Sequence, residues 1–162
     1  MVKFVRGDIV EIERKFIFDG GIDIEDLPCE KICQGYISLD PEVRLRKKGE
    51  RFYRTEKSKG DMVREERERE ISKEEYDLQI SDAKGILIEK TRYYKEYGKH
   101  TVEIDIFSGA LYGLKICEVE FSTEEEAKSF VPPVWFGAEV TNDSRFKNKN
   151  LALKGQIPIL ED

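Results

Sequence analysis

Polar and apolar residues alternate along most of the sequence. Because successive side chains of an extended strand point to opposite faces, a period of two favours β-strands. In residues 11–18, for example, Glu11 and Glu13 share one face while Ile12 and Phe16 share the other. The same alternation predicts eight strands, at residues 11–18, 32–38, 43–48, 51–58, 62–70, 86–94, 100–107 and 115–121.

Three segments have the pattern of helices instead. Residues 72–83 and 123–130 each open with a capping box, in which a Ser or Thr is followed by Glu three positions later. A third, basic helix is predicted over residues 144–155, with Asp143 or Ser144 as its N-cap. The fold class predicted from these elements is mainly β with flanking helices (α+β).

The polar face of the predicted strands is almost entirely ionisable, and like charges occur in pairs two residues apart. Such charges lie about 7 Å apart, so they repel modestly and add nothing to stability. The acidic pairs are Glu11/Glu13, Glu66/Glu68, Glu103/Asp105 and Glu118/Glu120, and the basic residues are Lys15, Arg44, Arg46, Lys57, Arg64, Lys90 and Arg92.

An open sheet with one solvated face does not explain this sorting of charge by strand, and it would leave its edges unprotected. Closing the eight strands into an antiparallel β-barrel removes the edges. The charged face then lines the lumen, and the apolar face points outward, partly covered by the helices. We therefore predict a closed eight-stranded barrel, or tunnel, with a charged lumen.

A dry lumen with this many charges would be unstable, so we expect it to hold water, a cation and a polyanion. Carboxylate oxygens without His or Cys favour Mg²⁺ or Mn²⁺ over zinc or copper. Arg and Lys bind phosphate oxygens, and a metal ion neutralises the charge that develops during phosphoryl transfer. The pattern therefore predicts a lumen that binds a divalent metal ion and a phosphate-bearing polyanion, as phosphoryl transfer requires.

The composition excludes several other classes of protein. Residues 1–162 are enough for one domain, and nine Phe and seven Tyr argue against disorder despite 38% charged residues. A net charge of −6 argues against a nucleic-acid partner. The sequence has no membrane-spanning apolar run and no secretory signal. The three cysteines (Cys29, Cys33 and Cys117) are expected to be free thiols, which favours a cytoplasmic location.

The order of the motifs resembles that of the CYTH superfamily, the triphosphate tunnel metalloenzymes. Each motif is weak by itself, but the series falls in the family's order over residues 9–152, and the family's fold is an eight-stranded tunnel. The motifs are E-x-E-x-K from Glu11, QGY from Gln34, R-x-R from Arg44, T-x-K from Thr55, R-x-E-x-E from Arg64, K-x-R from Lys90, E-x-D from Glu103, E-x-E from Glu118, and the stretch from Trp135 to Asn148.

The resemblance implies roles for individual residues. The metal-binding residues it implies are Glu11, Glu13, Glu118 and Glu120, with Glu103 and Asp105 as further acidic ligands. The triphosphate-binding residues are Lys15, Arg44, Arg46, Lys57, Arg64, Lys90, Arg92 and Arg145, the last at one tunnel mouth. The catalytic candidates are Glu66, Glu68, Lys90 and Asp105. The general base is left open, with a carboxylate that holds a water preferred over Lys90.

Two other functions stay open beside hydrolysis of inorganic tripolyphosphate or a related nucleoside or organic triphosphate. One is a class IV adenylyl cyclase that makes cyclic AMP from ATP, and the other is a non-catalytic polyphosphate-binding module. QGYIS followed by RLR resembles the bacterial short triphosphatases, and a binding module would not need the acidic pairs. Hydrolysis is therefore the leading hypothesis for the function. Whether the chain forms a homodimer is left open.

Four residues outside the charged pattern have expected structural roles. His100, the only histidine, is expected in a solvated turn, which argues against histidine acid–base catalysis. Trp135 is expected to anchor the barrel exterior. Arg14, in the apolar phase of its strand, is expected to pair with an acid of a helix. Arg69, in the opposite strand phase from Glu66, is expected outside the barrel.

Overall fold

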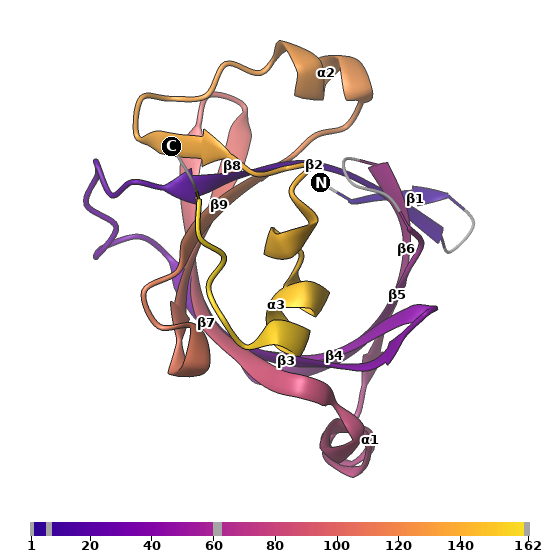
Figure 1. The fold of residues 1–162 in the computed structure, drawn as a ribbon. Helices are drawn as coiled ribbons and strands as arrows, with labels where there is room; N and C mark the ends of the chain where they lie inside the picture. Colours follow the sequence, from indigo (N-terminus) through magenta and orange to yellow (C-terminus); the bar gives the residue numbers. More distant parts are fainter. Residues whose placement is uncertain (1, 6–7, 60–62, 161–162) are drawn as a thin grey trace.

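The computed structural model describes residues 2–5, 8–59 and 63–160, and its main feature is an antiparallel sheet closed into a barrel (Figure 1). The eight barrel strands pair in the order β2-β6-β5-β4-β3-β7-β8-β9, and β9 pairs with β2 to close the ring. The predicted closed barrel is confirmed. The strands are β2 (Asp8–Phe18), β3 (Cys29–Leu39), β4 (Glu42–Lys48), β5 (Arg51–Lys57), β6 (Val63–Ile71), β7 (Lys84–Tyr97), β8 (His100–Ser108) and β9 (Lys115–Glu120).

Two short strands extend this barrel by pairing with β2. They are β1 (Val2–Val5) and β10 (Phe136–Glu139). Just before β10, Trp135 is buried and packs edge-on against Phe18 and Phe136, so the predicted exterior anchor is confirmed. Met62, which begins one predicted strand, lies outside the described residues.

The first two helices begin at the predicted caps. The hydroxyl of Ser72 accepts a hydrogen bond from the Glu75 amide at the start of α1, and that of Thr123 accepts one from Glu126 at the start of α2. Both helices lie outside the ring of strands (Figure 1). The helical elements are α1 (Lys73–Gln79), α2 (Glu124–Ser129), α3 (Asn148–Lys154) and the 3-10 helices η1 (Ile80–Asp82), η2 (Gly109–Leu111) and η3 (Ser144–Phe146). No helix in the described ranges is long and apolar enough to cross a membrane.

The prediction of one C-terminal helix over residues 144–155 was wrong. The structure has η3 and α3 instead, separated by Lys147 in an extended conformation with ψ near 136°. A tertiary contact accompanies the break, because the Nζ of Lys15 donates to the carbonyl of Phe146 at 3.0 Å. The backbone at this point is therefore tied to the lumen of the barrel, which the local sequence pattern does not signal.

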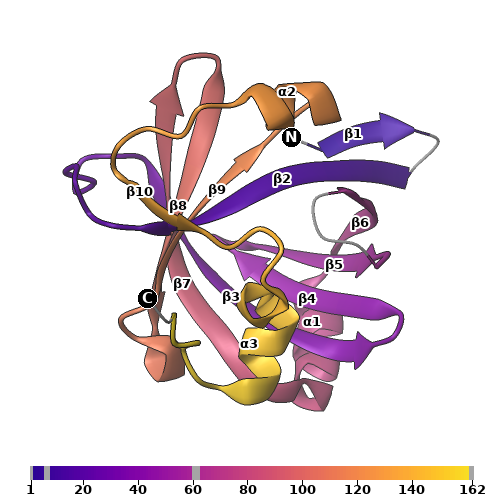
Figure 2. The same cartoon turned by 45° about the horizontal axis from the view of Figure 1, so that its top comes forward.

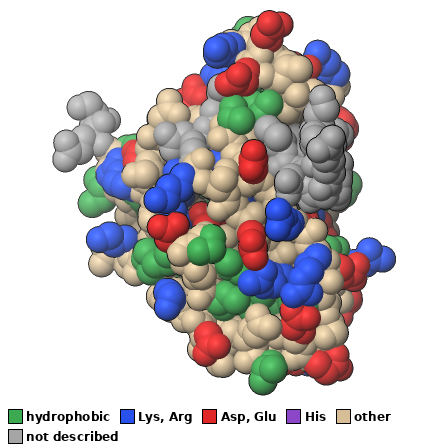
Figure 3. Space-filling view, turned by 90° about the vertical axis from the view of Figure 1, so that its right-hand side faces the viewer, with side chains coloured by type: hydrophobic (Ala, Val, Ile, Leu, Met, Phe, Trp, Pro, Cys, Tyr) green, Lys and Arg blue, Asp and Glu red, His purple; other side chains and the backbone are tan. Residues whose placement is uncertain are grey.

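Apolar residues of the strands pack under the outer helices, as predicted. One cluster joins β2, β8 and β9 to α2 and β10 and includes Phe16, Ile104 and Phe121. Another places Phe52 of β5 against Tyr76 of α1. Acidic and basic side chains are interspersed on the outer face that Figure 3 shows.

Two expectations about the exterior were wrong. Arg14 pairs with Glu139 of β10 at 2.8 Å, not with an acid of a helix, and also donates to the carbonyl of Phe130 at the end of α2. His100 is not solvated, because α2 and the residues around it cover the start of β8. Its ring packs edge-on against Phe121 and Phe130, with centroids 5.2 and 5.3 Å away.

The interior differs from the prediction at one end, where inward-facing positions are apolar. Ile88 shares a strand face with Lys90, and Phe107 shares one with Asp105, yet both are buried in one apolar cluster with Leu151 of α3. This inner apolar layer comprises Tyr36, Ile88, Phe107 and Ile116 with Phe146, Leu151 and Ala152. It exists because α3 lies across this end of the barrel (Figures 1 and 2) and needs apolar partners.

Candidate active site

The charged part of the lumen holds a cavity of about 300 Å³. Its walls are almost wholly the ionisable residues that the strand phase predicted to point inward. The lining residues are Glu11, Glu13, Arg44, Arg46, Lys48, Tyr53, Lys57, Arg64, Glu66, Glu68, Arg92, Glu103, Glu118, Glu120 and Asn148. The prediction that Glu11, Arg44, Glu66 and Glu118 face one common cavity is confirmed.

Three carboxylates converge where β2 meets β9. Glu13 lies directly opposite Glu120 in the strand register, and Glu11 precedes Glu13 by two positions along β2, on the same face. One oxygen from each of the three lies within 4.8 Å of the other two. We call Glu11, Glu13 and Glu120 the carboxylate cluster. Its donors are hard oxygens only, so they fit a Mg²⁺ or Mn²⁺ ion rather than a softer metal.

The electrostatics of the cluster favour a cation. Burial, with repulsion from Glu11 and Glu118, raises the pKa of Glu13 to about 8. Burial opposes ionisation of Glu11 as well. The charge of Lys57, a hydrogen bond with Glu66, and the charge of Arg64 nevertheless hold the pKa of Glu11 well below its usual value. Neighbouring carboxylates with such different pKa values share protons that a bound cation would displace.

Cations from β4, β5 and β6 border the cluster. The Nη2 of Arg64 lies 2.9 Å from Glu11, and the Nζ of Lys57 lies 3.4 Å from the same carboxylate. Arg44 lies 3.9 Å from Glu68, which also accepts a hydrogen bond from the Thr55 hydroxyl at 2.9 Å. This arrangement interleaves cations and carboxylates along the cavity wall, so that a metal ion and phosphate oxygens could be bound next to one another.

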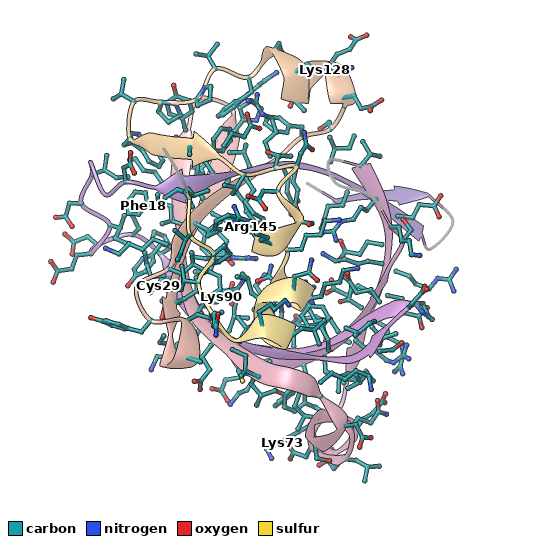
Figure 4. The ribbon with its side chains drawn as sticks, viewed as in Figure 1. Phe18, Cys29, Lys73, Lys90, Lys128 and Arg145 are labelled. Carbon is teal, nitrogen blue, oxygen red and sulfur yellow. The ribbon has the colours of Figure 1, made fainter. Side chains whose placement is uncertain are left out.

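Asp105 lies in a separate buried ion-pair group with Arg92 and Lys90. Arg92 donates to both Asp105 oxygens, at 2.8 and 2.9 Å, and the Nζ of Lys90 lies 2.8 Å from the same carboxylate. Burial opposes ionisation of Asp105, but the two cations hold its pKa far below the usual value. Burial lowers the pKa of Lys90 to about 8. Lys90 lies inside the ring of strands, whereas Lys73 and Lys128 lie on the outer helices (Figure 4).

Comparison with known proteins decides the family, although no protein-family model matches the chain. An inorganic triphosphatase of Nitrosomonas europaea is 41% identical over 149 residues, which cover 90% of this chain and 98% of the relative. The chain belongs to the inorganic triphosphatases of the CYTH superfamily. The predicted resemblance is therefore confirmed.

A further relative and a solved structure agree with that assignment. An inorganic triphosphatase of Acetivibrio thermocellus is 34% identical over 151 residues, which cover 87% of this chain and 92% of the relative. A crystal structure of an inorganic triphosphatase shares 39% identity with a TM-score of 0.67 and covers 88% of this chain and 94% of that chain. The likeness extends over nearly the whole barrel.

Within this triphosphatase fold, the predicted site residues do not all come together. Of the predicted metal-binding residues, Glu118 faces Lys15 at 3.6 Å, and Glu103 faces Arg92 at 3.5 Å. Asp105 has both oxygens engaged by cations. These three therefore lie outside the carboxylate cluster among the described residues, and their metal-binding role stays a prediction.

Arg145 does not line the lumen cavity. Its guanidinium pairs with Asp143 at 2.7 Å and donates to the carbonyl of Ile159 at 3.0 Å. Its place at a tunnel mouth and its role in triphosphate binding stay predictions.

Sequence reasoning gave no role to several residues at the α3 end of the lumen. Glu42 is buried between Arg64 at 3.9 Å and Lys149 at 3.7 Å. Its strand phase, shared with Arg44, could have revealed it, but it follows directly on the turn at Pro41. Asn148 accepts a hydrogen bond from Lys90 at 3.5 Å, a contact across 58 residues that no local pattern signals.

Proposed function

We propose that this chain hydrolyses inorganic tripolyphosphate, or a closely related triphosphate, in its lumen with the help of Mg²⁺ or Mn²⁺. The observation that carries the proposal is that the carboxylate cluster and the cations Arg44, Lys57 and Arg64 line one cavity. The inorganic triphosphatases that resemble the chain support the choice of reaction.

Glu11, Glu13 and Glu120 would hold the divalent ion, because their oxygens converge and each is a hard donor. When bound, the ion would neutralise charge on the phosphate oxygens. The buried guanidinium of Arg44 and its neighbours would bind the remaining phosphate oxygens and orient the scissile bond. Metal binding and phosphate binding would thus take place next to each other in one lumen.

Glu66 is our candidate for the group that accepts a proton from the attacking water. It is buried, and burial together with its hydrogen bond to Glu11 raises its pKa to about 7. Its Oε2 has no hydrogen-bond partner among the described residues. A carboxylate with a pKa near neutrality and a free oxygen is suited to exchange protons at physiological pH. Lys90 is instead held in a buried ion pair with Asp105, at 2.8 Å.

Phosphate release from tripolyphosphate, ATP and thiamine triphosphate, with cyclic AMP measured in parallel, tests the proposal. We expect tripolyphosphate to be hydrolysed fastest, with Mg²⁺ or Mn²⁺ required and no cyclic AMP formed. Cyclic AMP from ATP without tripolyphosphate hydrolysis would show a cyclase. Tripolyphosphate binding without turnover would show a binding module.

The thiols support a cytoplasmic place of action. Cys29, Cys33 and Cys117 are all free, and free thiols persist where the compartment is reducing. Fractionation of the source cells, with an antibody against this chain, tests the location.

A further inference from the structure

Arg46 differs from the other buried cations of the lumen. Lys57, Arg64 and Arg92, like their neighbours, each lie within salt-bridge distance of a carboxylate. For Arg46, no carboxylate lies that close in residues 8–59 and 63–160, although the residue is only 8% exposed. Burial, with repulsion from Arg44 and Arg92, lowers its pKa to about 10. Among the described residues, the charge on Arg46 is therefore buried without a carboxylate at ion-pair distance.

The contact that fixes Arg46 is with a neutral residue. Gln34 lies directly opposite it in the β3–β4 register, and the Oε1 of Gln34 accepts a hydrogen bond from the Nε of Arg46 at 2.8 Å. The Nε of arginine can only donate, so the facing atom of the amide must be its oxygen. The guanidinium is thus held by its inner nitrogen, which leaves the Nη1–Nη2 edge for another partner.

The environment of Gln34 does not favour the stability of the fold. It is fully buried, and its Nε2 has no hydrogen-bond partner among the described residues. A buried donor without an acceptor destabilises a fold, and an apolar side chain of the same size would avoid this. A glutamate would pair with Arg46 more strongly, but it would neutralise the charge that a phosphate group needs.

We propose that Gln34 is a positioning residue for triphosphate binding. It orients Arg46 through Nε and, because it is uncharged, leaves the Nη1–Nη2 edge with its full charge for two phosphate oxygens. Arg46 is then the anchor whose anionic partner is the substrate itself. The inference rests on the proposed function, and it identifies Gln34 as a residue that determines how strongly the same site binds the triphosphate.

Two substitutions test the role of Gln34 in the full chain. Gln34→Glu keeps the shape but places an anion on Arg46, so KM for tripolyphosphate should rise at least tenfold, with kcat within threefold of the unmodified value. Gln34→Met removes the acceptor and the unsatisfied donor, so KM should rise several-fold while the melting temperature stays equal or rises. Gln156→Glu, an exposed change of the same charge near the C-terminus, should leave KM unchanged.

A double variant tests whether Gln34 acts through Arg46. In an Arg46→Met background, Gln34→Met should have no further effect on KM. Fully additive effects, or KM within twofold of the unmodified value in both single variants, would overturn the inference.

Calorimetric binding of tripolyphosphate with EDTA present separates this inference from the proposed reaction. Gln34→Glu should weaken binding at least tenfold there as well, and unchanged binding would overturn the inference. An unmodified chain that binds tripolyphosphate but releases no phosphate would instead overturn the proposed reaction alone.

Discussion

At the scale of single residues, Glu11 and Glu120 can be tested apart from the fold. Glu11→Gln or Glu120→Gln keeps the side-chain volume but removes a hard anionic ligand, so turnover should fall by orders of magnitude at saturating Mg²⁺ or Mn²⁺. Circular dichroism should show an intact fold. Glu65→Gln, an exposed change on β6 beside Glu66, is the control and should retain full activity. Near-normal turnover in both lumen variants would place the metal elsewhere.

The second residue-scale prediction separates guanidinium geometry from charge. Arg46→Lys keeps the charge but loses the paired donors, so kcat/KM for tripolyphosphate should fall by about 2–3 kcal/mol of transition-state stabilisation. Arg69→Lys is the matched control, because Arg69 is exposed on β6 and pairs with Glu75 of α1 at 2.7 Å. Its kinetics should be unchanged. Equal losses in both variants would mean that the site lies outside the lumen.

The strand phase was enough to predict most of the residues that line the lumen cavity. Glu13 and Arg44 could be placed in the lumen because each belongs to a run of alternating charge. Gln34 could not be given a role, because its meaning depends on facing Arg46 across two strands. Convergence of Glu13 with Glu120 depends on a register between distant strands, which the sequence does not encode locally.

At the scale of elements, the approach of α3 to β7 depends on one glycine. Gly85 has a φ of +69°, and a Cβ added there would lie 2.1 Å from the carbonyl oxygen of Ala152. Gly85→Ala should therefore displace α3, with a clear loss of melting temperature and of tripolyphosphate turnover. Gly98→Ala is the control, because Gly98 has a φ of +59° and open space around it.

The Gly98→Ala control separates the effect of backbone strain from the effect of the clash between residue 85 and Ala152. Gly98→Ala should destabilise by about 1–2 kcal/mol, the cost of a left-handed alanine, and leave turnover unchanged. Thermal unfolding and phosphate release, measured on both variants, compare the two effects. Equal destabilisation by the two substitutions would show that α3 does not pack on Gly85 in solution.

Elements with local signals were predicted, and those set by distant contacts were not. The capping boxes at Ser72 and Thr123 located α1 and α2 correctly. The break at Lys147 was missed, because the Lys15–Phe146 contact that accompanies it spans 131 residues. The inner apolar layer was missed for a similar reason, since Ile88 and Phe107 continue a charged strand face and become apolar only where α3 covers them.

At the scale of the whole molecule, stability should depend on pH through the lumen carboxylates. The folded-state pKa values of Glu13 and Glu66 are raised to about 8 and about 7, above the unfolded value. Their contribution is fully present below about pH 4.5 and is lost as the pH rises through 7 and 8. The metal-free protein should therefore become less stable between pH 5 and pH 8.

Thermal unfolding with EDTA at several pH values tests this. One such proton changes stability by up to about 1.4 kcal/mol per pH unit. Glu13→Gln should flatten the curve and raise the melting temperature at pH 8, and Mg²⁺ should stabilise the unmodified protein most at that pH. A melting temperature that rises from pH 5 to pH 8 in the metal-free protein would contradict the assignment.

The pairing of β2 with β9 sets the order in which the chain can fold. During synthesis β2 leaves the ribosome early, but its partner edge is not complete until residue 120 has emerged. At about 5–20 residues per second, one edge of β2 then waits for roughly 5–20 s. Bringing β2 and β9 together is slow, because the entropy of the long chain between them is lost before their stabilising contacts form. Nascent chains that stall before residue 115 should thus carry two open strand edges and aggregate more readily than finished ones.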